Sequence, residues 1–147
     1  MTNRTVQAHC TFLDSPDLQT LYKCGTAVAH CPLSNAYFSA KPFPLREALE
    51  QHIKVGLGTD IAGGYSLDIM NTMRQAVSVS RMRQGDRILA ISEPGSKGAV
   101  DTEHASLGVD WIEALYLATR GGAVALGLQG CGTFEVGAPL DAQSSEF

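Results

Sequence analysis

Three residues whose side chains bind metals or move protons follow three short apolar segments of the chain. Asp60 lies within the run GLGTDIAGG (56–64), while His9 closes TVQAH and His30 closes TAVAH. Histidine and aspartate serve as metal ligands and as general acids or bases. In α/β enzymes the chemistry is concentrated at the C-terminal ends of parallel strands. The three residues therefore indicate one site at the carboxyl edge of a parallel sheet.

Each of these residues also has a structural interpretation. Asp60 could cap the turn that follows it, which is a common use of Asp after strands. His9 could be a buried, hydrogen-bonded histidine, but its match in position with His30 and Asp60 favours a functional role. His30 could line the pocket or hold the following loop by hydrogen bonds, and the second role is the favoured one.

The doublets His9-Cys10 and His30-Cys31 suggest a structural Cys₂His₂ zinc site. Neighbouring residues on a strand point to opposite faces of the sheet, so both members of a doublet could not reach one ion. The C-x₂-C spacing of such sites is also missing. The doublets therefore do not predict a zinc finger.

Size, charge and cysteine usage bound the function. The chain has 147 residues, at most one ordinary domain and fewer than the ~200–250 of a closed eight-stranded barrel. Its net charge of −4 is unlike the basic footprint of a nucleic-acid-binding protein. We see no secretory signal, no apolar run near the ~20 residues of a membrane span, and no dense disulfide spacing among the four cysteines. We expect a cytosolic protein without nucleic-acid or membrane partners.

The elements that must position the three residues alternate between strand and helix. Apolar residues at helical spacing follow each short apolar segment, which gives βαβαβα up to about residue 84. The second helix is preceded by a proline-rich loop over 31–44. A turn-rich loop is expected at 85–109, helices over 110–128 with a break at Gly121-Gly122, and a partial strand over 133–142.

Short apolar strands separated by helices make a parallel sheet with right-handed crossovers, so the fold class is α/β. Three such strands leave two unpaired sheet edges, which are an aggregation liability. We therefore expect these three strands to be part of a larger sheet.

Taken together, these motifs resemble the amidohydrolase superfamily and, within it, the guanine deaminases. The AGG turn after Asp60 is fairly specific to guanine deaminases, whereas the histidine motifs are shared with related deaminases and hydrolases. The resemblance covers nearly the whole chain and is carried by AHC (8–10), AVAHCPLSN (27–35), GLGTDIAGG (56–64), MRQA (73–76), EALYLAT (113–119), GGA (121–123), ALGL (125–128) and FEVG (134–137).

The resemblance implies a zinc-dependent (β/α)₈ TIM barrel, of which residues 1–147 supply strands six to eight and the closing helices. Asp60 matches the aspartate that binds Zn²⁺ and takes a proton from its water. His9 matches the histidine that positions and polarises that water and the purine, and His30 is a candidate for the substrate-pocket wall. The implied reaction is hydrolytic deamination of guanine to xanthine and ammonia, by an enzyme that forms a homodimer when full length.

The chain also departs from the family pattern. The strand-one His-x-His pair and the strand-five His-x-x-Glu are absent. A catalytic zinc needs about three protein ligands, and Asp60 is the one assigned here. We therefore expect the isolated chain to lack deaminase activity.

Three other functions stay open. The chain could belong to another amidohydrolase, acting on a different purine, a pyrimidine or a triazine. It could be a truncated, non-catalytic product that pairs with a full-length subunit through its open sheet edges. It could also be a small doubly wound domain that binds a nucleotide or phosphate, although a phosphate loop is absent and the glycine pair Gly56-x-Gly58 has Ile61 at the sixth position of the dinucleotide fingerprint.

Overall fold

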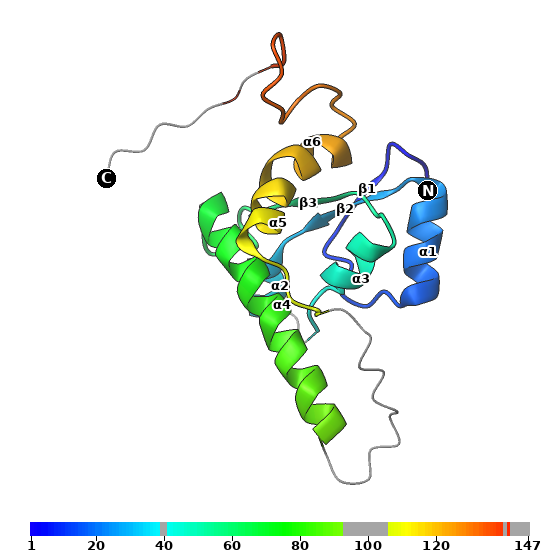
Figure 1. Cartoon of the computed structure of the whole chain (residues 1–147), viewed down its shortest axis with the longest axis vertical. Coiled ribbons are helices and arrows are strands. Elements are labelled where there is room, and N and C mark those ends of the chain that lie inside the picture. The colour runs from blue at the N-terminus through cyan, green and yellow to red at the C-terminus, as the bar shows by residue number, and fades with distance from the viewer. Residues whose placement is uncertain (39–40, 93–105, 140, 142–147) are drawn as a thin grey trace, which may run out of the picture.

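The computed structural model of the chain describes residues 1–38, 41–92, 106–139 and 141 (Figure 1). Strands and helices alternate through the first half, and helices dominate the second. In chain order the elements are β1 (Val6–Ala8), α1 (Ser15–Cys24), β2 (Ala27–His30), α2 (Pro32–Phe38), α3 (Leu45–Glu50), β3 (Val55–Leu57), α4 (Ile69–Ser92), α5 (Trp111–Tyr116), the π-helical turn η1 (Leu117–Gly121) and α6 (Gly122–Ala125).

The three strands form one parallel sheet in the order β1-β2-β3. Val6 lies opposite Ala27, and Val28 lies opposite Val55. In Figure 1, α1 lies to the right of the strands and α4 to the left, with α3 between the two helices. The parallel arrangement confirms the predicted α/β class, and it brings the carboxyl ends of all three strands to one edge.

Sequence signals set the ends of α1. Asp14 is the N-cap and forms a capping box with Asp17. Gly25 closes the helix with a φ of 67°, a left-handed conformation that glycine adopts without strain. The tight turn after Gly25 leads directly into β2.

Helix α2 occupies a segment that the sequence predicted to be a loop. Pro32 is its first residue, where the fixed φ of proline suits a helix and its missing N–H has no partner to lose. Leu33 and Asn35 are buried, so α2 is anchored by its first turn. The prolines predicted a loop, but the first of them starts a helix.

Helix α4 is longer than predicted. It continues to Ser92, so residues 85–92 of the expected loop are helical. Gly85 lies inside this helix, where glycine costs only about 1 kcal/mol relative to alanine and does not end it. Residues 93–105 of the predicted loop lie outside the described residues.

The predicted break at Gly121-Gly122 is wrong, because η1 and α6 continue the helical path through both glycines. A Cβ at Gly121 would lie 2.7 Å from the carbonyl oxygen of Val55. A Cβ at Gly56 would lie 2.8 Å from the Cα of Gly122. The absence of side chains at these glycines therefore allows the helical segment to pack closely against β3.

The predicted strand over 133–142 is not found in its described part. Residues 133–139 and 141 lie in turns and irregular structure. Gly137 has a φ of 86°, which an extended strand does not accommodate. The other residues of that prediction lie outside the described residues.

The core lies between the sheet and the surrounding helices. Arg46 of α3 links that core to α5, because its guanidinium donates to both carboxylate oxygens of Glu113 at 2.7 and 2.9 Å and to the Gly108 carbonyl at 2.6 Å. The buried hydrophobic cluster consists of Leu18, Leu21, Val28, Phe43, Leu45, Ala48, Ile53, Val55, Val109 and Leu117.

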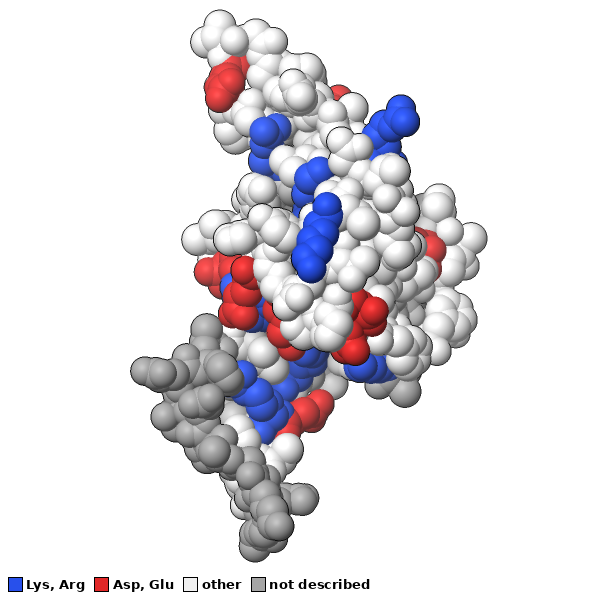
Figure 2. Space-filling model, turned by 90° about the vertical axis from the view of Figure 1, so that its right-hand side faces the viewer, with Lys and Arg blue, Asp and Glu red and all other residues white. Residues whose placement is uncertain are grey.

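Basic and acidic side chains both gather on the face shown in Figure 2, and no single-sign surface covers its described part. Among the described residues, no helix combines the length and apolar character needed to cross a membrane.

Candidate active site at the strand ends

His9 and Asp60 come together although they follow different, non-neighbouring strands. His9 directly follows β1, and Asp60 comes three residues after β3. His9 Nε2 lies 3.8 Å from Asp60 Oδ2, with 42% and 31% of the two side chains exposed. The structure thus brings two of the three predicted residues into one solvent-accessible pair.

The backbone around this pair is strained. His9, Cys10, Asp60 and Ala62 have φ values of 66°, 53°, 52° and 74°. A non-glycine residue in the left-handed region costs about 1–2 kcal/mol. Such conformations persist where the surrounding structure enforces them, and they cluster at functional sites. The observed strain supports a functional assignment for both strand ends.

The glycine turn after Asp60 wraps around its carboxylate. A Cβ at Gly63 would lie 2.5 Å from Asp60 Oδ2, so no larger residue fits there without a shift. The N–H of Gly64 donates to the Asp60 carbonyl oxygen. Glycine at position 63 is therefore required by the close approach of the backbone to this side chain.

Asn35 also belongs to the site, although sequence reasoning placed it only in a loop. Its Oδ1 lies 2.8 Å from His9 Nδ1. Asn35 comes from the first turn of α2, immediately after β2, and is 6% exposed. Its place five residues after the strand-end His30 was the available signal, but only the helical path of α2 turns it toward His9.

His30 differs from His9 in its surroundings. It is 2% exposed, and its ring packs against Phe43 with the centroids 5.1 Å apart. Burial, the charge of Arg83 and then that of His9 lower the pKa of His30 to about 3. His30 is therefore neutral near pH 7, and its burial favours the structural role over direct contact with a ligand.

The two cysteines beside the histidines are poor nucleophiles. Burial, and then the charge of Asp60, raise the pKa of Cys31 to about 11. Burial also raises the pKa of Cys10 above its ordinary value. Because the thiolate is the reactive form of cysteine, the geometry supports chemistry at His9 and Asp60 and not at a thiol.

The pair suits zinc in donor type but does not complete a site. One imidazole nitrogen and one carboxylate oxygen, 3.8 Å apart, could both approach a single ion at the ~2.0–2.2 Å typical of zinc. Within the described part of the chain, no group of three or more His, Cys, Asp or Glu residues is placed to hold a metal. His9 and Asp60 thus offer at most two of the about three protein ligands that a catalytic zinc requires.

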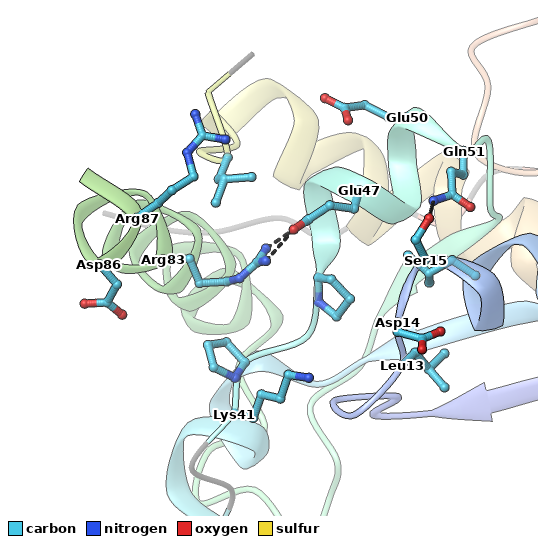
Figure 3. A pocket seen from close by; sticks show the side chains of 14 residues that line it. Leu13, Asp14, Ser15, Lys41, Glu47, Glu50, Gln51, Arg83, Asp86 and Arg87 are labelled. Atoms are coloured by element: carbon cyan, nitrogen blue, oxygen red, sulfur yellow. Dashed lines mark hydrogen bonds and ion pairs between the residues drawn. The ribbon is translucent and has the colours of Figure 1, made fainter. Parts of the chain in front are cut away.

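A cleft of about 720 Å³ lies elsewhere, between α1, α3 and α4, and none of the three predicted residues lines it (Figure 3). Glu47 accepts hydrogen bonds from both terminal nitrogens of Arg83, at 3.0 and 2.5 Å. Although burial opposes it, the Arg83 guanidinium holds the pKa of Glu47 below its ordinary value. This ion pair ties α3 to α4, and we assign the cleft no chemistry.

Comparison with known proteins identifies the class. The amidohydrolase family matches residues 2–144, so the chain belongs to this family. Human guanine deaminase is 41% identical over 143 residues, which cover 97% of this chain and 28% of that protein.

Solved structures agree with this assignment. Guanine deaminase of E. coli is 32% identical, with a TM-score of 0.69 over 91% of this chain and 26% of the other. A guanine deaminase from C. acetobutylicum, solved with guanine in its active site, is 25% identical, with a TM-score of 0.71 over 91% and 28% of the two chains. The resemblance seen in the sequence is confirmed. The chain spans little more than a quarter of the length of these relatives and has the fold of one part of them.

Proposed function

We propose that this chain carries part of the active site of a guanine deaminase, and that a longer protein containing it hydrolyses guanine to xanthine and ammonia. The observation that carries the proposal is the pairing of His9 with Asp60 across two strand ends, 3.8 Å apart. The 41% identity to human guanine deaminase supports guanine as the substrate.

Asp60 and His9 have complementary roles in this reaction. A zinc ion, when bound, lowers the pKa of a water molecule and so makes a nucleophile available near neutral pH. Asp60 would hold the ion and take a proton from the attacking water, while His9 would orient and polarise that water and the purine. The water oxygen would form a bond to C2 of guanine as one proton of the water goes to N3. The bond from C2 to the amino nitrogen would then break as the second proton goes to the amino group, which leaves as ammonia while the oxygen stays on C2 as a carbonyl. His30 forms the wall behind the site.

The three strands would be strands six to eight of a (β/α)₈ barrel, with residues 1–147 forming its C-terminal portion. The remaining zinc ligands and the proton-shuttling glutamate would come from outside this chain. We therefore propose that the isolated 147 residues do not deaminate guanine. We also propose a cytosolic location, which the four free cysteines suit, and a homodimer for the longer protein.

The test is xanthine formation by the longer protein, followed by ultraviolet absorbance, with zinc content measured on the same sample. Asp60→Asn should lower kcat by about 10³-fold or more, because it removes both a ligand and a proton acceptor. Asp86→Asn, an exposed aspartate of α4, is the matched control and should change kcat little.

A panel of guanine, adenine, cytosine and a chlorotriazine separates a guanine deaminase from other amidohydrolases. Preference for one of the other compounds would replace guanine as the substrate. Full activity of Asp60→Asn would contradict the assignment of the site itself.

A further inference from the structure

We propose that Asn35 is a positioning residue that fixes the tautomer of His9, so that Nε2 of His9 is the unprotonated nitrogen facing Asp60. The tautomer does not depend on the proposed deaminase function. The identity of the group that binds to the Nε2 lone pair does rest on that function.

The two ring nitrogens of His9 have separate partners. Nδ1 lies 2.8 Å from Asn35 Oδ1, and Nε2 lies 3.8 Å from Asp60 Oδ2. A carboxamide oxygen can only accept a hydrogen bond, so Nδ1 must carry the hydrogen. In a neutral imidazole the other nitrogen is then an acceptor. Asn35 therefore directs the lone pair of His9 toward the carboxylate.

Asn35 is held firmly enough to impose this choice. Its backbone N–H donates to the carbonyl oxygen of Cys31 at 2.9 Å, which fixes it in the first turn of α2. It is 6% exposed, so water does not readily replace its amide oxygen. The neighbouring Leu33 is 1% exposed and anchors the same turn.

The arrangement creates two acceptors that face one another. A neutral Nε2 and the Asp60 carboxylate cannot hydrogen-bond to each other without a proton or cation between them. At 3.8 Å they are placed to receive a water O–H or a metal ion jointly. A histidine ligand generally donates its other ring N–H to an oxygen acceptor, which fixes its orientation, and loss of that acceptor costs about 10–100-fold in affinity or activity.

The decisive experiment is ¹⁵N NMR of the histidine side chains in the 147-residue chain at pH 8, where an ordinary imidazole is neutral. We expect the Nδ1–H form for His9. His52, which is exposed, serves as an internal reference for an unconstrained ring. Nε2–H in the wild type would overturn the proposal, because the amide nitrogen of Asn35 would then face His9. A doubly protonated ring at this pH would also overturn it.

Variants of Asn35 test whether this residue determines the tautomer of His9. Asn35→Leu has a similar shape without an acceptor and should shift His9 toward Nε2–H. Asn35→Asp keeps an acceptor oxygen and should retain Nδ1–H. Ser34→Ala, at the neighbouring buried position, is the matched control and should change nothing. An unchanged tautomer in Asn35→Leu would contradict the proposal. If Asn35→Leu fails to fold, loss of the Nδ1–H form of His9 in Asn35→Asp would contradict the proposal.

In the longer protein, Asn35→Leu should lower kcat about 10–100-fold with a smaller change in KM. Asn35→Asp should recover part of the loss. An inactive wild-type protein would refute the deaminase function. The NMR experiment would still test whether Asn35 fixes the tautomer of His9. Unchanged kcat in Asn35→Leu would show that the tautomer has no catalytic consequence, which would remove Asn35 from the site's machinery.

Discussion

The same two residue types, His-Cys, end two neighbouring strands of this sheet, and the structure uses them differently. After β1, His9 and Cys10 turn into the left-handed region, with φ values of 66° and 53°. After β2, His30 ends the strand and Cys31 leads into α2. The first turn holds His9 partly in solvent, whereas the second buries His30 to 2% exposure. Backbone direction at the strand end, not residue type, separates a reactive position from a core position.

The difference extends to the partners. His9 faces Asn35 and Asp60, which can accept a proton or a hydrogen bond. His30 faces the ring of Phe43, and its buried Nδ1 has no hydrogen-bond partner among the described residues. Because burial disfavours the charged form, His30 is suited to packing and His9 to proton chemistry.

The largest expected contrast is in folding free energy. His30→Ala should lower the stability of the chain by about 3 kcal/mol, because it removes a fully buried ring and leaves a cavity. His9→Ala should cost about 1 kcal/mol or less, since its side chain is 42% exposed. Urea denaturation followed by circular dichroism measures both. Equal losses in the two variants would break the distinction between the two strand ends.

Thiol reactivity should show the next largest effect. With its pKa raised to about 11, Cys31 carries a thiolate in only about one molecule in a thousand at pH 8. Iodoacetamide should therefore modify Cys31 about 100-fold more slowly in the folded chain than in urea, as followed by peptide mass spectrometry. Burial also raises the pKa of Cys10, but Cys10 is only partly buried whereas Cys31 is buried, so the modification of Cys10 should be slowed less. Labelling of Cys31 as fast as Cys10 in the folded chain would argue against the burial of the second doublet.

The pH dependence of stability gives a smaller effect. The folded-state pKa of His30 is about 3, below the ~6.5 of an unfolded histidine. The unfolded chain therefore takes up a proton first as the pH falls. Stability from this residue is complete above pH 6.5 and is lost between 6.5 and about 3, with a loss of roughly 2 kcal/mol at pH 5.

His30→Leu removes this titrating group, so its stability should depend less on pH between 7 and 5 than that of the wild type. His52→Leu, at an exposed position, is the matched control and should keep the wild-type slope. An unchanged slope in His30→Leu would mean that His30 is not buried in its neutral form.

Much of the fold could be predicted from the sequence, because apolar periodicity and caps are local signals. The alternation of strands and helices and the parallel sheet follow from such patterns and are observed. The helical path through Gly121 could not be predicted, since only the approach to β3 shows why a glycine is needed there. Local propensity indicated a break, and tertiary packing overrode it.

The sequence selected three candidate residues for the site but neither its geometry nor Asn35. Position at matching strand ends selected His9, His30 and Asp60, yet the same pattern could not show that His30 turns inward. It also could not reveal Asn35, because the contact depends on a helix where the prolines predicted a loop. Long-range juxtaposition, which no short sequence window contains, decides which strand-end residues share a site.

The most direct test of the central claim compares His9→Gln with His30→Gln in the longer protein, measuring kcat for guanine deamination at a temperature where both variants are folded. We predict that His9→Gln loses about 10²-fold or more in kcat, whereas His30→Gln retains kcat within a few-fold and has a lower melting temperature. Near wild-type kcat in His9→Gln, or a large loss of kcat in a stable His30→Gln, would contradict the division of roles between the two strand ends.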